Sequence, residues 1–191
     1  MIGAITAGLY GTGVPPVTNS YESIATVTVG SGGSSSISFS SIPSTYKHLQ
    51  IRGIAQELST SPGYDSIDIV LNSDAGANYS WHRLLGNGSA ASADAGTSQN
   101  YGLAGTMYYT TAGASNVFNA VVADVLDYQN ANKYKTIRSL AGVDNNGAGT
   151  VGLLSTSWRS TSAVTSITLY PDNRVRSFAQ YSQFALYGIK G

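Results

Sequence analysis

The chain has 191 residues, a net charge of zero, no cysteine and a charged fraction of 10%, with 27 Ser and 17 Thr in place of charged side chains. The lack of cysteine excludes a disulfide framework and a thiolate metal site, and the lack of a basic surplus or a basic run excludes the field that attracts nucleic acid. No stretch approaches the roughly 18 consecutive apolar residues of a membrane span, and the N-terminus lacks the pattern of a signal peptide, so we expect synthesis in a cytoplasm.

Residues 1–20 are predicted to form an extended arm outside the folded domain. The first charged residue is Glu22, four glycines interrupt the segment, and Pro15-Pro16 favours an extended exit. A disordered tail is one interpretation. An arm docked on a neighbouring subunit is favoured, because the large apolar side chains of the segment would otherwise sit in water. These side chains are Ile2, Ile5, Leu9 and Tyr10.

Residues 21–191 are predicted to form one all-β domain, an antiparallel, jelly-roll-like sandwich of about ten strands. Apolar and polar side chains alternate from Tyr21 onward, Gly and Ser turns follow at short spacing, and no segment sustains a helical period. Residues 21–29 and 37–39 are predicted to form a hairpin, and the small, polar residues 86–100 a long surface loop. The remaining candidate strands are 49–54, 67–72, 79–85, 101–109, 117–128, 134–143, 151–158, 164–170 and 178–189.

Two of these strands carry apolar residues on both faces, which is typical of strands inside a sheet. Residues 120–126 could form a helix by length, but their β-branched side chains favour a central strand. The last strand places Phe184 and Leu186 on one face and further apolar residues on the other. We therefore expect the last strand to lie inside the sheet rather than at a free edge.

No arrangement of residues indicates an active site, so no enzyme activity, catalytic residue or cofactor is expected. His48 and His82 are the two histidines, and no Gly-x-Ser-x-Gly turn accompanies them. Sugar hydrolysis needs two flanking carboxylates, yet Glu22 and Glu57 are the only glutamates, and both lie near strand ends. The closest acidic pairs are separated by three residues and are expected to point to opposite faces of a strand. These pairs are Asp65 with Asp68 and Asp124 with Asp127.

No metal site is expected either. Residues 72–78 and 144–147 contain clustered Asn and Asp side chains, whose oxygen atoms calcium can use as ligands. Neither segment has the spacing of an EF-hand or its closing glutamate. Asx turns explain both segments more simply.

Two groups of residues are candidates for binding. Trp81, Trp158 and Tyr109 could stack on a glycan, although tryptophans of a sandwich more often pack in its core. Arg174 and Arg176 form the one local concentration of positive charge. A solvated loop and an ion pair with an acidic patch on a neighbouring subunit both account for these arginines.

Three stretches of the domain resemble structural proteins of tailed bacteriophages. They are residues 39–52, with Ile42-Pro43-Ser44-Thr45-Tyr46 at the entry to a strand, residues 71–80, and the closing residues 184–190. The resemblance implies a jelly-roll-like virion building block from a group that includes head decorations, head fibres and tail-fibre modules. That group has no shared catalytic motif.

The resemblance implies first of all a non-enzymatic capsid decoration (cement) protein, located in the virion. Its partners would be other copies of itself, as a trimer by analogy, and the major capsid protein or another virion subunit, bound through the arm and lateral contacts. The alternative is a tail-fibre or head-fibre module that recognises a host surface glycan. Neither function involves nucleic acid, a membrane or a cofactor.

Overall fold

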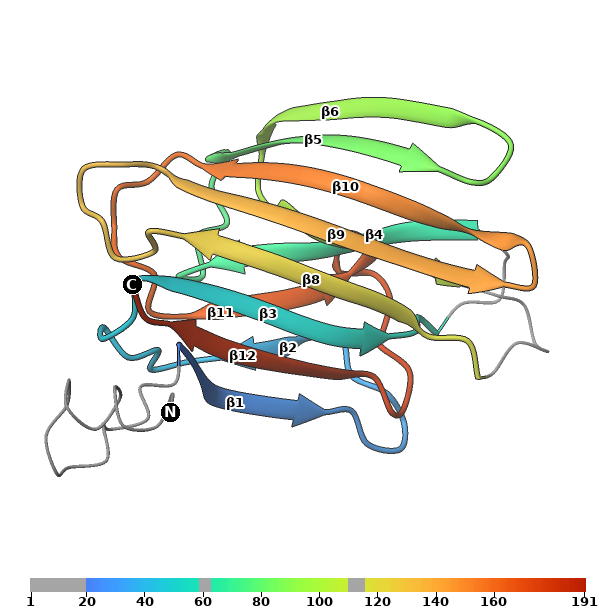
Figure 1. The fold of residues 1–191 in the computed structure, drawn as a ribbon, viewed down its shortest axis with the longest axis horizontal. Helices are drawn as coiled ribbons and strands as arrows, with labels where there is room; N and C mark the ends of the chain where they lie inside the picture. The colour runs from blue at the N-terminus through green and yellow to red at the C-terminus, as the bar shows by residue number, and fades with distance from the viewer. Residues whose placement is uncertain (1–19, 59–62, 110–115) are drawn as a thin grey trace, which may run out of the picture.

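The computed structural model describes residues 20–58, 63–109 and 116–191, which fold into two β-sheets packed face to face (Figure 1). Twelve strands and one short 3-10 turn, η1 (Asp172–Arg174), make up the regular structure of these ranges. The predicted all-β antiparallel sandwich is confirmed, with twelve strands rather than about ten. The strands are β1 (Tyr21–Thr28), β2 (Ile37–Phe39), β3 (His48–Ala55), β4 (Gly63–Leu71), β5 (Tyr79–Gly86), β6 (Ala91–Gln99), β7 (Gly102–Tyr109), β8 (Asn119–Leu126), β9 (Lys135–Asn145), β10 (Ala148–Trp158), β11 (Ile167–Pro171) and β12 (Gln183–Ile189).

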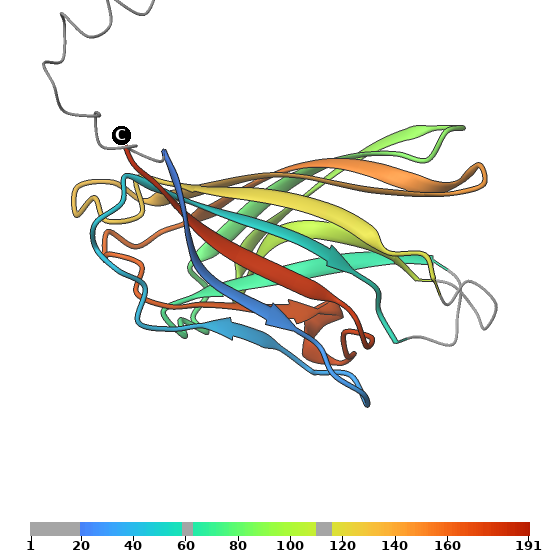
Figure 2. The ribbon, with the colours of Figure 1, turned by 60° about the horizontal axis from the view of Figure 1, so that its bottom comes forward.

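The two sheets differ in size. The large sheet has eight strands in the order β1-β12-β3-β8-β9-β10-β5-β6, and the small sheet has four in the order β2-β11-β4-β7. All of these strand pairs are antiparallel. Figure 2 shows the sheets as two layers, with β5 and β6 at one margin of the large sheet. The small sheet covers one face of the large sheet, and no described residue covers the other.

The core lies between the sheets and follows from the alternation of side chains along each strand. In β8, Val121, Ala123 and Val125 are buried, whereas Ala120 and Val122 point to the opposite, more exposed face. Apolar burial between two such inner faces is the main source of stability in a sandwich. The largest fully buried side chains are Tyr79, Tyr128, Lys135, Phe178, Phe184, Ile37, Leu49, Ile51, Ile67, Ile69, Leu71 and Leu103.

Both predictions of a strand inside the sheet are confirmed. Strand β12 lies between β1 and β3, and β8 lies between β3 and β9. In β12 the side chains of Phe184 and Leu186 are buried against the core. Because β12 has hydrogen-bonded neighbours on both edges, only its two faces can contact other parts of the protein or solvent. Both faces of β12 are largely apolar.

Two other predictions are wrong. Strands β1 and β2 do not form a hairpin, because β1 pairs with β12 in the large sheet and β2 pairs with β11 in the small sheet. Residues 86–100 are not a long loop, because they contain β6, which pairs with β5 along its length. The small residues of β6 carry no alternation signal. Its pairing is instead held by Arg83, which donates two hydrogen bonds, of 2.9 and 2.6 Å, to the carboxylate of Asp94; tertiary pairing overrides a weak strand propensity.

Candidate functional site

The most extended functional feature is the face of the large sheet that points away from the small sheet. Strands β8, β9 and β10 carry large apolar side chains on both sides, because the same alternation that buries Val121, Ile137 and Leu154 places others outward among polar residues. In an antiparallel sheet with one solvated face, outward positions are usually polar. An apolar outward face therefore calls for a functional explanation.

The outward apolar side chains are aligned across neighbouring strands. Val122 of β8 is paired with Leu140 of β9, Leu140 with Leu153 of β10, and Leu153 with Leu84 of β5. The three leucines are each about half exposed, at 50% for Leu140 and 51% for Leu153 and Leu84. This alignment forms a continuous row of aliphatic side chains that runs perpendicular to the strands.

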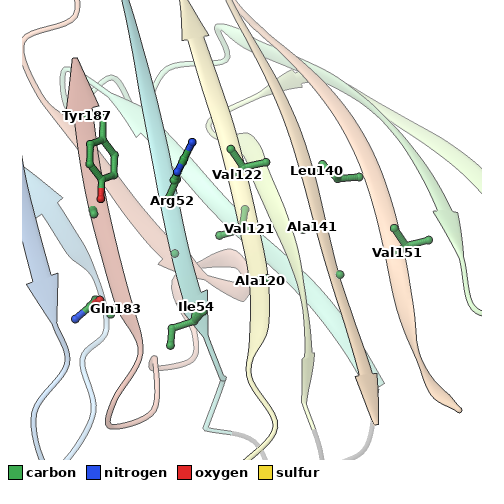
Figure 3. Close-up of a pocket in the computed structure, with 13 residues that line it drawn as sticks. Arg52, Ile54, Ala120, Val121, Val122, Leu140, Ala141, Val151, Gln183 and Tyr187 are labelled. Carbon is green, nitrogen blue, oxygen red and sulfur yellow. The ribbon is translucent and has the colours of Figure 1, made fainter. Parts of the chain in front are cut away.

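A second row runs beside the first. It contains Ile54 of β3, Ala120 of β8, Gly142 of β9 and Val151 of β10, which are consecutive partners in the sheet. Small residues in the middle of this row leave a shallow groove between larger neighbours, as Figure 3 shows. We call the combined surface the apolar outer face. It consists of Ile54, Leu84, Ala120, Val122, Leu140, Gly142, Val151 and Leu153.

Charged groups border the apolar outer face but neutralise one another. Gln50 donates a 2.7 Å hydrogen bond from Nε2 to Oδ1 of Asp124, and Arg138 lies 3.6 Å from the other carboxylate oxygen of Asp124. Arg52 Nε donates a 2.6 Å hydrogen bond to Oε1 of Gln50. The border therefore contains both signs of charge in contact with each other, and it creates no strong field that would repel an identical surface.

The composition of the apolar outer face limits its chemistry. It offers aliphatic side chains and glycine, with no nucleophile and no hydroxyl group among its members. Such a surface associates with another apolar surface by excluding water, at roughly 25 cal/mol for each Å2 of apolar area. Its geometry suits a broad, flat partner rather than a small substrate.

A second candidate site is a group of acidic side chains at the edge of the core. Carboxylate oxygens of Glu57, Asp65 and Asp172 all lie within 4.8 Å of one another. We call these three residues the carboxylate cluster. Glu57 follows β3 and is only 3% exposed, Asp65 lies in β4, and Asp172 begins η1.

The η1 turn holds Asp172 in place through an unusual backbone conformation. Asp172, Asn173 and Arg174 have φ angles of 32°, 48° and 67°, so three consecutive non-glycine residues are left-handed. Such residues are disfavoured by contact between Cβ and the backbone. The buried carboxylate of Asp68 fixes the turn, because it accepts a 2.9 Å hydrogen bond from the backbone N–H of Asn173 and a 2.5 Å bond from the hydroxyl of Ser66.

Burial and mutual repulsion govern the charges of these carboxyl groups. Burial raises the pKa of Glu57 to about 8, and the charges of Asp65 and Asp172 add to that rise. Burial also raises the pKa of Asp65 to about 6, with a further contribution from its hydrogen bond with Asp172. The pKa of Asp68 rises to about 7 because of burial, although the bonds from Ser66 and Asn173 oppose the rise. Carboxyl groups perturbed in this way are typical of binding and catalytic sites, and also of structural networks.

The structure places the residues predicted to bind a glycan in different surroundings. Trp158 is 2% exposed, and its indole N–H donates a 2.7 Å hydrogen bond to Asp74. Burial leaves it no free ring face for a sugar, so the core interpretation is correct for Trp158. Trp81 is partly exposed and lies under Arg83, whose guanidinium carbon is 5.7 Å from the ring centroid. Tyr109 ends β7, and its side chain lies outside the described part of the structure.

The residues predicted to contact a partner are also placed only in part. Ile2, Ile5, Leu9 and Tyr10 lie outside the described residues. The two arginines do not form a free basic patch. Arg174 donates a hydrogen bond to the backbone oxygen of Asn100 and stacks on Tyr170, and Arg176 lies 3.6 Å from Glu57 and 3.7 Å from Asp172. Arg176 therefore makes ion pairs inside the chain, and an ion pair with a neighbouring subunit stays a prediction.

Residues 72–78 and 144–147 form Asx turns, as the sequence predicts. Asp74 accepts hydrogen bonds from the backbone of Gly76 and from the side chain of Asn78, and Asp144 accepts one from the backbone of Gly147. His48 also has a structural role, because its Nδ1 accepts a hydrogen bond from the backbone N–H of Asp127. The carboxylate cluster is a different group of acidic residues from these turns.

Sequence reasoning missed both the apolar outer face and the carboxylate cluster. A signal for the face exists in the two-sided apolar pattern of β8 to β10, but the row of leucines depends on the register of four strands.

No helix among the described residues is long and apolar enough to cross a membrane. No family model, curated protein or solved structure matches the chain. The geometry of the chain is therefore the basis for assigning a function.

Proposed function

We propose that this protein is a non-enzymatic structural subunit of a bacteriophage particle, in the first place a head decoration protein, and that its copies contact one another through the apolar outer face. One observation carries the assembly part of this proposal. Leu84, Leu140 and Leu153 stand side by side on three adjacent strands, and each is half exposed. Contiguous exposed apolar surface of this kind marks protein interaction sites.

A second copy of the chain is the occupant that fits this face best. The chain has no net charge, and the border groups Asp124 and Arg138 are paired with each other. An identical surface therefore meets no electrostatic penalty on approach. A face-to-face contact between copies is also self-complementary under two-fold symmetry, because the same patch serves both subunits.

The strength expected of one such contact agrees with a role in a particle. Burying the exposed half of an aliphatic side chain contributes about 1 kcal/mol, and association opposes this with a cost of at least about 4 kcal/mol. A pair of copies is therefore held weakly. When many copies sit on one shell, each contact becomes effectively intramolecular, and attachment becomes durable.

The phage part of the proposal rests on the sequence resemblance of residues 39–52, 71–80 and 184–190 and on the charge-poor, hydroxyl-rich composition. The arm, residues 1–20, would bind the major capsid protein or another virion subunit.

The alternative function is a fibre module that binds a host glycan. A surface group on strands β1, β3 and β12 supports this alternative. There, Arg52 lies 5.6 Å from the ring centroid of Tyr21 and 5.8 Å from that of Tyr187.

Sedimentation velocity of the full chain over a wide range of concentration tests the assembly step. We expect the wild type to self-associate as concentration rises, and the double variant Leu140→Lys, Leu153→Lys to stay monomeric, because burying two ammonium groups in the contact is costly. Tyr134→Lys is the matched control, since Tyr134 is 57% exposed and lies outside the apolar outer face. A wild type that stays monomeric, or a double variant that associates like the wild type, contradicts the proposal.

Mass spectrometry of phage particles purified from the cells that carry the gene tests the virion role. We expect the chain among the abundant virion proteins, and we expect deletion of residues 2–14 to lower its occupancy on heads. Full occupancy without the arm contradicts the cement mechanism. Glycan-array binding that is lost in Trp81→Ala or Tyr187→Ala, together with absence from heads, would favour the fibre module instead.

A further inference from the structure

The carboxylate cluster combines features that a network of hydrogen bonds alone does not explain. Glu57 is 3% exposed, and within the described ranges neither of its carboxylate oxygens accepts a hydrogen bond. A buried carboxylate without hydrogen bonds is strongly disfavoured unless it is protonated or a cation balances it. The same side chain contributes an oxygen atom to the group of three carboxylates that lie within 4.8 Å. An unsatisfied buried oxygen therefore points at a site with two further oxygen ligands.

Arg176 is a cation already present at this site, but it does not balance the cluster. Its Nε lies 3.6 Å from Glu57 and 3.7 Å from Asp172, which are ion-pair distances that are too long for good hydrogen bonds. Within the described residues this buried Nε itself has no hydrogen-bond partner. One guanidinium faces three carboxylates, and Asp68 adds a fourth nearby acidic group that is bound to Ser66 and Asn173. The ionised cluster thus retains an excess of two negative charges or more.

From these contacts we propose that the carboxylate cluster binds one calcium ion between Glu57, Asp65 and Asp172. The ligand set favours calcium. Mg2+ gives up its water ligands reluctantly and is usually bound by one or two carboxylates, whereas three carboxylates lie within 4.8 Å of one another here and Glu57 is buried. Calcium takes six to eight oxygen atoms, which carboxylates in bidentate mode and water supply.

A calcium ion at this position joins the two layers of the sandwich. Glu57 follows β3 of the large sheet, whereas Asp65 and Asp172 belong to β4 and to the turn after β11, both of the small sheet. The ion also binds the first residue of the strained η1 turn. This activity is separate from self-association, because none of the three ligands belongs to the apolar outer face.

Isothermal titration calorimetry of the full chain, stripped with EDTA and dialysed, tests the proposal with CaCl2 as the titrant. We expect one calcium ion per chain with a Kd below about 1 mM, and at least tenfold weaker binding of MgCl2. Calcium at 100 times its Kd is expected to raise the melting temperature by about 5–10 °C, and EDTA is expected to reverse the rise. A wild type that binds no calcium, or that binds magnesium as well as calcium, overturns the assignment.

Two ligand variants and one control make the test specific. Glu57→Gln and Asp172→Asn are expected to weaken calcium binding at least tenfold, whereas Asp144→Asn, which changes an exposed carboxylate near the end of β9, is expected to leave it unchanged. In EDTA at pH 9, above the pKa of Glu57 of about 8, Glu57→Gln is expected to melt above the wild type, because a buried charge is removed. In saturating calcium it is expected to melt below the wild type. This reversal in the order of the two melting temperatures between EDTA and calcium distinguishes a calcium ligand from a merely structural residue.

The remaining outcomes are also decisive. Unchanged calcium binding in both ligand variants overturns the proposed site, as does a loss of binding in Asp144→Asn that equals theirs. If Glu57→Gln melts below the wild type in EDTA as well as in calcium, the carboxylate is held by contacts of the protein alone, and the cation site is rejected. Each variant is checked for native β-structure by circular dichroism, and the wild-type titration decides the question without any variant.

Discussion

The two faces of the large sheet are built from the same strands but meet different surroundings. On β10, Leu154 points inward and is 1% exposed, whereas its neighbour Leu153 points outward and is 51% exposed. Along β9, Ile137 and Leu140 differ in the same way. The inner face is apolar because the small sheet covers it. The outer face carries a contiguous group of aliphatic side chains although no described residue covers it, and this contrast is the reason for proposing that these residues contact a partner.

The largest effect is expected from removing the strand on which the inner face depends. A chain that ends at residue 183 lacks Phe184 and Leu186 and leaves β1 and β3 without the strand between them. We expect it to be unfolded by circular dichroism. A chain that ends at residue 189 keeps β12 and is the control; it is expected to stay folded with little loss of stability, because it removes only the exposed ion pair of Lys190 with Glu22. Soluble, cooperatively melting protein from the shorter chain would refute the interior role of β12.

The sharpest comparison uses two adjacent residues of the same type. Leu154→Ala is expected to lower the free energy of unfolding by about 2–5 kcal/mol, because it opens a cavity in the core. Leu153→Ala is expected to change the stability of the monomer by no more than about 0.5 kcal/mol but to weaken self-association. Urea denaturation at low protein concentration measures the first effect, and sedimentation velocity measures the second. Equal losses of stability in both variants would mean that the outer face belongs to the core of the monomer.

Glycines test the same contrast at smaller scale. A Cβ atom on Gly152 would lie 2.8 Å from Cδ2 of Leu85 and 3.3 Å from Oγ1 of Thr106. A Cβ atom on Gly86, which pairs with Val151 of the apolar outer face, would contact only Val151, at 3.7 Å. We expect Gly152→Ala to lower the free energy of unfolding by about 1–3 kcal/mol through crowding. Gly86→Ala is expected to be neutral or slightly stabilising. Thermal melting of both variants checks the difference, and a larger loss for Gly86→Ala would contradict the assignment of the two faces.

The smallest effect is expected from an exposed arginine beside the apolar outer face, and a more buried arginine on the inner side of β5 provides the comparison. The side chain of Arg138 is 65% exposed and lies 3.6 Å from Asp124, so Arg138→Ala is expected to cost less than about 1 kcal/mol. Arg83 points to the inner side of its strand, is 16% exposed, and binds Asp94 through two hydrogen bonds. Arg83→Ala is therefore expected to cost about 1.5–3 kcal/mol. Chemical denaturation measures the loss of stability in each variant. A larger loss for Arg138→Ala than for Arg83→Ala would contradict these assignments.

Sequence periodicity predicts much of this fold but not the partners of each strand. It identifies the all-β class, the central position of residues 120–126 and the interior position of the last strand, because these depend on side-chain character along one segment. It fails for β1 and β2, since a Gly-rich turn such as Gly30–Gly33 can reverse a chain within one sheet or lead it into the other layer. It also fails for β6, whose small residues form a strand only because β5 offers an edge.

The candidate sites depend on distant parts of the chain and were not predictable in the same way. Glu57 and Asp172 are separated by more than one hundred positions in the sequence, and only the pairing of β4 with β11 brings Asp172 near Asp65. Alternation predicts that Asp65 and Asp68 face opposite sides of β4. Alternation does not predict that the η1 turn contacts both residues. The backbone of the turn is hydrogen-bonded to Asp68, and the carboxylate of its first residue lies beside Asp65.

The interior position of β12 has a consequence for how the chain folds during its synthesis. Tyr21 of β1 pairs with Ile189 of β12, and His48 of β3 pairs with the same residue from the other side. The large sheet therefore cannot be completed until residue 189 has left the ribosome. Until then β1 and the edge of β3 that pairs with β12 stay unpaired, while more than a hundred residues are added. Pairings between the two ends of a chain are slow to form, and open strand edges are prone to aggregate. The high content of Ser and Thr in the chain reduces that risk during the delay.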